Sequence, residues 1–214
     1  MLLKELREEV LQTALKVDKY GLITLTGGNV SGRDKETGYI VVTPSGLEYD
    51  TLSPEDMVIV DLEGNIIEGH YKPSVDTASL LYIFKNRDDI NGLIHTHSTY
   101  ASSFAVKHES IPVVSTTLAN EIGGEVPVAR FTGAALNFGP SVCEVIGDVK
   151  ACLLANHGVM AVGSSVKHAL VAAVMLEDAA KVYYLAKTSG TPIELPAEEI
   201  KRAKEVFAFT YGQK

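Results

Sequence analysis

The sequence predicts an α/β fold in which a single mixed β-sheet is flanked by helices. Helical and strand-like patterns alternate along the 214 residues, which indicates helices packed on a sheet. Several strand-like runs are short and separated only by turn residues, which favours hairpins over a doubly wound parallel sheet. The length fits one compact domain covering residues 1–214.

The first third of the chain begins with a helix and continues with short strands. Leucine, valine and alanine recur at helical spacing over residues 2–19, and Gly21 marks the end of this pattern. The runs that follow are rich in β-branched residues, and Glu63-Gly64-Asn65 is typical of a hairpin turn. We therefore expect strands at 39–42, 57–61 and 66–68.

The rest of the chain alternates more regularly between the two patterns. A helical segment leads through the polar run 86–89 into an apolar strand, and the longest helical pattern stops at Gly190. The expected helices cover 75–86, 134–146, 165–188 and 197–210, with another beginning near Tyr100, and the expected strands cover 90–97, 113–116, 126–129, 151–155 and 159–162.

Composition excludes several classes of partner. The net charge of −8 and a pI near 5.2, with no basic run, argue against nucleic-acid or anionic-membrane binding. No window reaches the ~18 apolar residues that a membrane span requires, and the charged N-terminal segment lacks a signal-peptide core. Cys143 and Cys152 are too few for a disulfide framework. We expect a soluble cytoplasmic protein.

Two histidines, His95 and His97, follow the apolar pair Leu93-Ile94. Because side chains alternate along a strand, both imidazoles point the same way, as ligands of a divalent metal would. A His-x-His pair is also common on exposed strands. His157, however, has the same setting after a second apolar strand, and the two sites together favour a metal centre. Neutral imidazoles suit Zn²⁺, with Mn²⁺ or Co²⁺ as competitors.

Hydroxyl- and glycine-rich segments elsewhere could hold an anion. Ser74 or Asp76 would cap the helix expected at 75–86, and a helix N-terminus with a hydroxyl is also an anion site. The segments 24–32 and 43–46 match neither a dinucleotide nor a Walker loop, and either could be a simple turn. Together with Ser74 they would suit a single phosphate.

These segments, in this order, resemble the class II sugar-phosphate aldolase and epimerase family, which shares its fold with the adducin head. The resemblance runs from Gly27-Gly28-Asn29 through His95-Thr96-His97 and Asn156-His157-Gly158 to the terminal Tyr211 segment. It implies a cytoplasmic α/β protein that forms a homotetramer with active sites between neighbouring subunits. It also implies a small-molecule sugar phosphate as the partner.

The resemblance also implies a role for individual residues. Three histidines would bind zinc, an aspartate would act as an acidic ligand or catalytic group, and a C-terminal tyrosine would reach toward a site. These residues are His95, His97 and His157 for the metal, Asp76 for the acid, Tyr211 for the tyrosine, and Asn29, Ser45, Gly46 and Ser74 for the substrate phosphate.

The implied reaction is retro-aldol cleavage of a ketose 1-phosphate, of the L-fuculose 1-phosphate type, to dihydroxyacetone phosphate and an aldehyde. The metal would polarise the sugar carbonyl while the C3–C4 bond breaks. The alternative is an L-ribulose-5-phosphate 4-epimerase, which would retain the aldehyde and re-add it to its opposite face. A non-catalytic, adducin-like head domain is a third reading, which the complete set of histidines disfavours.

Four positions bear on the choice of reaction. In the family that the chain resembles, glutamate at position 76 is usual for fuculose aldolases, whereas aspartate, as here, is epimerase-like. Val75 replaces a serine that would assist phosphate binding, and Thr116 stands where the fuculose aldolase has a catalytic tyrosine. Epimerases carry an aspartate at the place of Asn120. Because an amide cannot shuttle a proton, Asn120 favours the aldolase.

Overall fold

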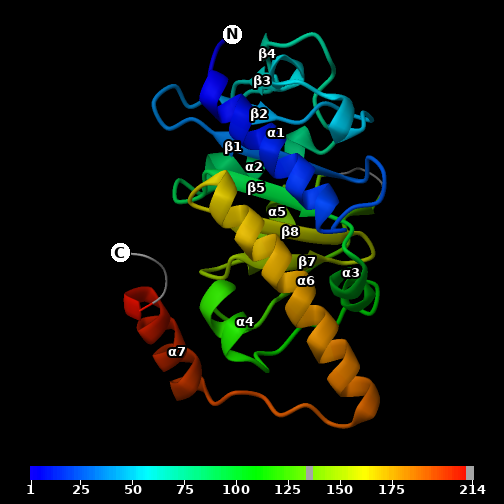
Figure 1. Ribbon diagram of the computed structural model, residues 1–214, viewed down its shortest axis with the longest axis vertical. Helices are drawn as coiled ribbons and strands as arrows, with labels where there is room; N and C mark the ends of the chain where they lie inside the picture. Colours follow the sequence, from blue (N-terminus) through cyan, green and yellow to red (C-terminus); the bar gives the residue numbers. More distant parts are fainter. Residues whose placement is uncertain (134–136, 211–214) are drawn as a thin grey trace.

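A mixed β-sheet forms the centre of the computed structural model, which describes residues 1–133 and 137–210 (Figure 1). Its strands are β1 (Gly28–Arg33), β2 (Ile40–Val42), β3 (Val58–Val60), β4 (Ile66–Glu68), β5 (Gly92–Thr96), β6 (Val128–Ala129), β7 (Ala151–Leu154) and β8 (Gly158–Gly163). The order across the sheet is β4-β3-β2-β1-β5-β8-β7-β6. Only the β6–β7 pair is parallel among the described strands. The predicted fold class is confirmed.

Helices cover both faces of this sheet. They are α1 (Lys4–Lys19), α2 (Thr77–Asn86), α3 (Thr99–Ala105), α4 (Thr116–Glu121), α5 (Gly139–Val145), α6 (Val166–Ser189) and α7 (Ala197–Thr210), with short 3₁₀ turns η1 (Tyr49–Thr51) and η2 (Pro54–Asp56). One core lies between the sheet and α1, α3, α4 and α6, and a second lies under α2 and α5. The last helix, α7, packs on α4. Within the described ranges, no helix is both long and apolar enough to cross a membrane.

The alternation of side chains along β5 decides where its histidine points. Leu93 belongs to the core under α2 and α5, whereas Ile94 belongs to the core on the opposite face. His95 follows Leu93 by two residues and therefore faces the α2 and α5 side. Its ring accordingly lies 5.6 Å from the ring of Phe138, the residue before α5 (centroid to centroid).

The strand expected at 113–116 is wrong. Helix α4 begins at residue 116. The β-type pairing near this segment is an isolated bridge between Ile111, which lies before the expected strand, and Val126. The reason is a helix cap: the Ser115 side chain accepts a hydrogen bond from the backbone N–H of Leu118 at 3.2 Å. That cap satisfies an end of the helix that would otherwise lack a partner, and it outweighs the β-propensity of the valines before it.

The segment 24–32, interpreted from sequence as a loop, is largely a strand. From Gly28 onward it forms β1, which pairs with β2 on one side and β5 on the other. Its glycine content is a packing requirement here, because a Cβ at Gly32 would lie 2.6 Å from Cγ2 of Val166. Helices α1 and α6 can therefore approach the middle of the sheet closely. Only the residues before Asn29 remain available to a loop site.

The other expected elements are present with small differences in their ends. The helix expected at 134–146 is the exception in length: α5 begins at Gly139, and residues 134–136 lie outside the described part of the chain. The hairpin expected at 63–65 does connect the antiparallel pair β3 and β4. The cysteines are free, and burial raises the pKa of both the Cys143 and Cys152 thiols, which keeps them protonated at neutral pH.

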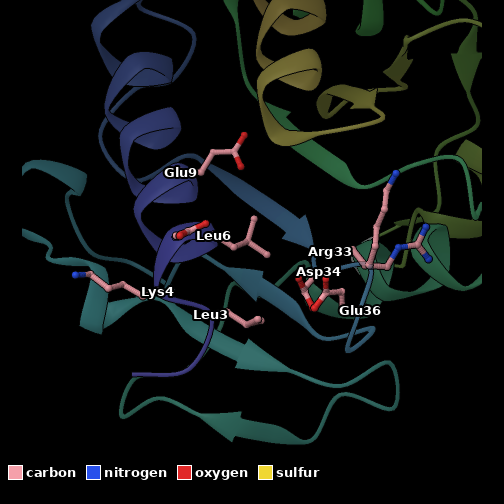
Figure 2. Close-up of a pocket in the computed structure, with 9 residues that line it drawn as sticks. Leu3, Lys4, Leu6, Glu9, Arg33, Asp34 and Glu36 are labelled. Carbon is pink, nitrogen blue, oxygen red and sulfur yellow. The ribbon is translucent and has the colours of Figure 1, made fainter.

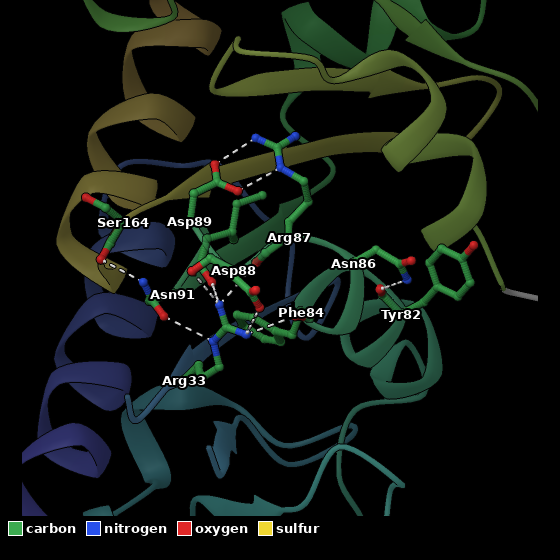
Figure 3. Close-up of polar contacts among 10 residues, drawn as sticks. Arg33, Tyr82, Phe84, Asn86, Arg87, Asp88, Asp89, Asn91 and Ser164 are labelled. Atoms are coloured by element: carbon green, nitrogen blue, oxygen red, sulfur yellow. Dashed lines mark hydrogen bonds and ion pairs between the residues drawn. The ribbon is translucent and has the colours of Figure 1, made fainter. Parts of the chain in front are cut away.

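A half-buried arginine holds the connection between α2 and β5. Arg33, at the end of β1, donates to Oδ1 of Asn91 at 3.0 Å and to the carbonyl oxygens of Phe84 and Ile90 at 2.9 and 2.6 Å (Figure 3). It also donates to two further carbonyls of the same connection. Asp76 directly precedes α2, and His97 directly follows β5. The connection between these two elements therefore helps to fix the positions of both residues relative to each other.

Candidate metal centre

Three histidine side chains converge at one edge of the central sheet. One ligand nitrogen from each of His95, His97 and His157 lies within 4.8 Å of the others. The Nε2 atoms of His95 and His97 are 3.0 Å apart, and the ring of His157 lies 4.6 Å from that of His95 (centroid to centroid). A single cation could therefore contact all three imidazoles after small side-chain adjustments.

His95 is the buried member of the three, with 1% of its surface exposed. It lies in β5, between Asn29 of β1 and Met160 of β8. Its Nδ1 donates a hydrogen bond to the carbonyl oxygen of Val159 at 2.8 Å. Because that bond places the proton on Nδ1, the Nε2 lone pair faces the other two imidazoles, as a metal ligand requires.

His97 lies one residue beyond the end of β5 and is exposed. Its backbone leads through Ser98 directly into α3. The first turn of that helix is held from a distance, because the carboxylate of Glu177 on α6 accepts from the N–H groups of Tyr100 and Ala101 at 2.8 and 2.9 Å. The direction in which the chain leaves β5, and with it the place of His97, is thus fixed by α6.

His157 is half-buried in the tight turn between β7 and β8. The turn closes through a hydrogen bond from the His157 N–H to the carbonyl of Leu154 at 2.9 Å. Asn156 has a φ of 55° in the left-handed region, which asparagine tolerates better than most residues. This backbone aims the His157 side chain back toward the end of β5.

The surroundings favour the neutral form of the three imidazoles. Burial is the largest cause that lowers the pKa of His95 to about 3, with smaller contributions from the neighbouring His157 and His97. Burial also lowers the pKa of His97 and of His157, although the carboxylate of Asp76 opposes the shift at His157. Neutral imidazole is the form that binds Zn²⁺, Mn²⁺ or Co²⁺, so the donor set fits a divalent cation.

Asp76 occupies the N-cap position of α2, but its side chain does not cap the helix. The carboxylate instead accepts from Nδ2 of Asn29 at 2.8 Å, and its Oδ2 lies 3.9 Å from Nε2 of His95. Burial raises the pKa of Asp76, while His157 and the Asn29 hydrogen bond oppose this shift. The alternative that Asp76 is a plain N-cap is therefore wrong.

The cavity in front of the histidines has a volume of about 160 Å³. Ser45, Gly46 and Ser74 lie in its wall together with the three histidines. Asn29 lies behind Asp76, and its Oδ1 is buried without a hydrogen-bond partner among the described residues. The cavity is lined by Thr26, Gly27, Gly28, Pro44, Ser45, Gly46, Ser74, Val75, Asp76, His95, His97 and His157.

Other residues considered from sequence lie away from this cavity. Tyr211 falls outside the described residues. Thr116 and Asn120 lie on α4 and do not line the cavity of their own chain, whereas Val75 lines it with 67% of its surface exposed. Sequence patterns did not reveal Glu177, which acts on the site through α3, because it lies 77 residues from its partner Tyr100.

A larger cavity elsewhere lacks a histidine cluster. One of about 620 Å³ lies between the start of α1 and the connection from β1 to β2, with Lys4, Glu9, Arg33 and Asp34 around it (Figure 2). Its charges are of both signs, and no histidine or cysteine lines it. The cavity of about 160 Å³ differs from it, because three clustered histidines and the hydroxyls of serine residues line it.

The chain is similar to known proteins along most of its length. The model of the class II aldolase and adducin N-terminal domain matches residues 8–184. The 5-deoxy-D-ribulose 1-phosphate aldolase of Bacillus thuringiensis serovar kurstaki is 39% identical over 214 residues, which is 100% of both chains. The L-ribulose-5-phosphate 4-epimerase UlaF of Salmonella paratyphi C is 34% identical over 197 residues, 86% of each chain. The structure of an L-fuculose 1-phosphate aldolase superposes with a TM-score of 0.90, at 33% identity, over 96% of this chain and 97% of that one.

Proposed function

Because the chain belongs to the class II aldolase and adducin N-terminal domain family, we propose that it is a metal-dependent aldolase. Its substrate is a ketose 1-phosphate, which it cleaves to dihydroxyacetone phosphate and an aldehyde. The observation that carries this proposal is the convergence of three neutral imidazoles beside a hydroxyl-lined cavity. Such a site can bind a cation and a phosphorylated sugar side by side.

His95, His97 and His157 are the proposed metal ligands, and zinc is the proposed metal, with Mn²⁺ or Co²⁺ as competitors. A cation held there would supply Lewis-acid polarisation of the sugar carbonyl. The protein contributes the orientation of the ligands, since the Val159 carbonyl fixes the His95 tautomer. Second contacts of this kind commonly raise metal affinity by about 10- to 100-fold.

Asp76 is the proposed proton acceptor. Its carboxylate takes the proton of the C4 hydroxyl as the C3–C4 bond breaks, and the electron pair of that bond moves toward C2. A proton returned to C3 completes dihydroxyacetone phosphate. Burial raises the pKa of Asp76, which brings this acid closer to the working pH and favours proton transfer. Asn29 orients the carboxylate through its 2.8 Å hydrogen bond.

The substrate phosphate is proposed to lie against Ser45, Gly46 and Ser74, whereas Asn29, also expected there from sequence, is buried behind Asp76 and does not line the cavity. The backbone N–H of Ser45 already donates to the carbonyl of Lys72 at 3.0 Å, so its hydroxyl is the group left for the phosphate. Gly46, with a φ of 71°, turns the chain around the cavity. Hydroxyls and backbone donors at such a turn suit an anion in an otherwise acidic protein.

Two relatives indicate where to begin with substrates. The full-length relative is named for 5-deoxy-D-ribulose 1-phosphate and the structural relative for L-fuculose 1-phosphate. Both sugars are ketose 1-phosphates and differ in the part that leaves as the aldehyde. We therefore propose that the phosphate end is shared, and that residues 113–131 and the C-terminal segment, which includes Tyr211, select the aldehyde.

The second candidate is an L-ribulose-5-phosphate 4-epimerase. The aspartate at position 76 and the relative of that name favour it. Asn120 disfavours it, because an epimerase must deliver protons to both faces of the aldehyde and an amide cannot do so. A non-catalytic, adducin-like role is disfavoured by the complete set of histidines and acid.

The proposed assembly is a homotetramer with active sites between neighbouring subunits. Thr116 and Asn120 lie on α4, outside the cavity of their own chain, so any part they play at a site requires a neighbouring copy. Light scattering after gel filtration gives the mass of the assembly. A monomer with full activity would contradict this proposal and leave the metal centre untouched.

One assay tests the reaction. Purified, metal-loaded protein is given 5-deoxy-D-ribulose 1-phosphate, L-fuculose 1-phosphate and L-ribulose 5-phosphate, with and without chelator, and dihydroxyacetone phosphate is detected by a coupled enzyme. We expect chelator-sensitive release from at least one 1-phosphate. Release from neither, together with conversion of L-ribulose 5-phosphate to D-xylulose 5-phosphate without free aldehyde, would establish the epimerase instead.

Two variants separate the proposed roles. His157→Ala should lose both stoichiometric metal and activity while remaining folded, as judged by circular dichroism. Asp76→Asn should keep the metal but lose at least ~100-fold in kcat if the carboxylate is the proton acceptor. Loss of metal from Asp76→Asn would make Asp76 a ligand, and full activity in His157→Ala would remove His157 from the site.

A further inference from the structure

We propose that His108 is a positioning residue for the metal centre: its imidazole holds Asn156 and thereby fixes the turn that presents His157. This inference rests on the proposed function, in which His157 is a metal ligand. From sequence, His108 looks like an ordinary solvated histidine in a polar loop. The structure gives it a specific partner on a different loop.

The contact joins two loops that are distant in sequence. Nε2 of His108 lies 2.6 Å from Oδ1 of Asn156, which is 48 residues away. Because an amide oxygen can only accept, the imidazole donates the hydrogen bond. His108 belongs to the loop after α3, and Asn156 is the residue immediately before His157 in the β7–β8 turn.

Both partners have a left-handed backbone, a conformation uncommon for residues other than glycine, asparagine, aspartate and histidine. The φ angles of His108 and Asn156 are 52° and 55°, in the left-handed region. Non-glycine residues keep this conformation where the surroundings determine it, commonly at functional sites. A second hydrogen bond, from the Asn156 N–H to the carbonyl of Ala105 at 3.2 Å, ties the same turn to the end of α3. Asn156 is therefore held both through its side chain and through its backbone N–H.

The loop that carries His108 is itself anchored. The N–H groups of His108 and Glu109 donate to the carbonyls of Ala105 and Phe104 at 3.2 and 3.1 Å. The carboxylate of Glu109 also forms an ion pair with Lys187 of α6. Through the His108 imidazole, the positions of α3 and α6 therefore constrain the turn at Asn156.

This arrangement makes α3 a spacer between two ligands. The helix begins two residues after His97, and its far end holds Asn156 through Ala105 and His108. His97 and His157 both lie outside the paired part of the sheet, so ladder hydrogen bonds do not fix their separation. The helix and its two contacts with Asn156 supply that constraint.

The expected effect is a loss of metal affinity without a loss of fold. His108→Ala removes the donor and should weaken binding about 10-fold, the lower end for groups outside the ligand shell, since it acts through the backbone. Asn156→Gly keeps a residue suited to a φ of 55° but removes the acceptor, and should weaken binding equally. His108→Gln should restore affinity, because the glutamine Nε2 can donate from a similar place.

The measurement is a titration of the metal-free full-length chain with Co²⁺, followed by visible absorption, with competition against Zn²⁺. The intensity of the absorption bands reports ligand geometry, which a purely structural role of His108 would leave unchanged. The matched control is His168→Ala, because His168 hydrogen-bonds Ser164 at 2.7 Å beyond the opposite end of β8. Circular dichroism monitors folding, and Asn156→Gly carries the test if His108→Ala unfolds.

The outcomes separate this inference from the proposed function. Weaker binding in His108→Ala and Asn156→Gly, with recovery in His108→Gln, supports it. Wild-type affinity and spectrum in both His108→Ala and Asn156→Gly, while His157→Ala binds no metal, would overturn this inference alone. An equal loss in His168→Ala also overturns it, since the effect would then be unspecific. A wild-type chain that binds no Co²⁺ or Zn²⁺ overturns both.

Discussion

Gly158 lies where the start of β8 passes the two histidines at the end of β5. A Cβ at this position would sit 2.4 Å from the carbonyl oxygen of Thr96 and 2.8 Å from Cδ2 of His97. Both atoms belong to the segment that presents a metal ligand, so an added methyl group must displace it. A glycine is therefore required by the close approach of two strands.

We predict that Gly158→Ala destabilises the protein by about 1–3 kcal/mol, as overpacked cores do, and weakens metal binding. The matched control is Gly190→Ala: Gly190 has an extended φ of 170°, and nothing lies within 4 Å of its Cβ position. Urea unfolding and Co²⁺ titration measure the two effects. Equal stability of both variants would contradict the expectation.

Tyr49 provides a pH-dependent test at a second residue. Its hydroxyl donates to the carbonyl oxygen of Gly28 at 2.9 Å. Burial raises the pKa of Tyr49 to about 12, with a smaller contribution from Asp18 and an opposing one from Thr43. The folded state thus keeps the hydroxyl proton at pH values above 10.0, which is the ordinary pKa at which the unfolded chain releases it. Stability from this group is complete below pH 10 and is lost as the pH rises toward 12.

We predict that wild type loses about 1.4 kcal/mol relative to Tyr49→Phe for each pH unit above 10, up to the folded pKa. At neutral pH the wild type should be more stable by about 1 kcal/mol, because the variant loses the hydrogen bond to the partly buried Gly28 carbonyl. Urea unfolding of both proteins at pH 7, 9 and 11 measures the difference. A difference that stays constant across these three values would refute the assignment.

At the scale of elements, α3 depends on a carboxylate from another helix. Its N-cap residue, Ser98, makes no side-chain cap, and Glu177 instead accepts from the N–H groups of Tyr100 and Ala101. Negative charge at a helix N-terminus is also favoured by the helix dipole. The helix that follows His97 is therefore stabilised by a tertiary contact and not by its own sequence.

We predict that Glu177→Ala costs about 1–3 kcal/mol, the range for losing hydrogen bonds to a charged group, and weakens metal binding through His97. Asp178→Ala, an exposed change at the adjacent position of α6, is the control. Thermal unfolding and Zn²⁺ competition provide the two readouts. Unchanged metal affinity in a destabilised Glu177→Ala would limit Glu177 to a structural role.

Elements also show which parts of the chain could be predicted. The strands around His95 and His157 are apolar runs of the expected length, and both formed where the pattern indicated. The strand expected at 113–116 failed because the cap at Ser115 was not recognised, and β1 was missed because its glycines resemble a turn. Gly32 of β1 is required by its close approach to α1 and α6. These helices are distant from it in sequence, so no local pattern indicates the contact.

For the whole molecule, a bound cation would connect parts of the fold that are otherwise separate. The three histidines come from β5, from the connection between β5 and α3, and from the turn between β7 and β8. A cation that binds the folded state alone stabilises it by about 4 kcal/mol at 1,000 times its Kd. For a chain of this size that corresponds to a rise in Tm of roughly 10 °C.

We predict that excess Zn²⁺ raises the Tm by roughly that amount and that chelator reverses it. His95→Ala should remove the effect, and Mg²⁺, which prefers oxygen ligands, should not reproduce it. Differential scanning fluorimetry measures all three. An equal rise in His95→Ala would show that the cation binds elsewhere.

Local patterns in the sequence were enough to predict the donor chemistry and the fold class. Alternation along a strand is a local property, so His95 and His97 could be assigned to one side from their spacing alone. The spatial arrangement of the remaining groups follows from the tertiary structure. The pairing of β5 with β8 and with β1 brings His157 and Asn29 to His95, and Asp76 turns from its helix toward them. The Asn29–Asp76 and His95–Val159 hydrogen bonds join residues 47 and 64 positions apart, and hydrophobic periodicity carries no information at that range.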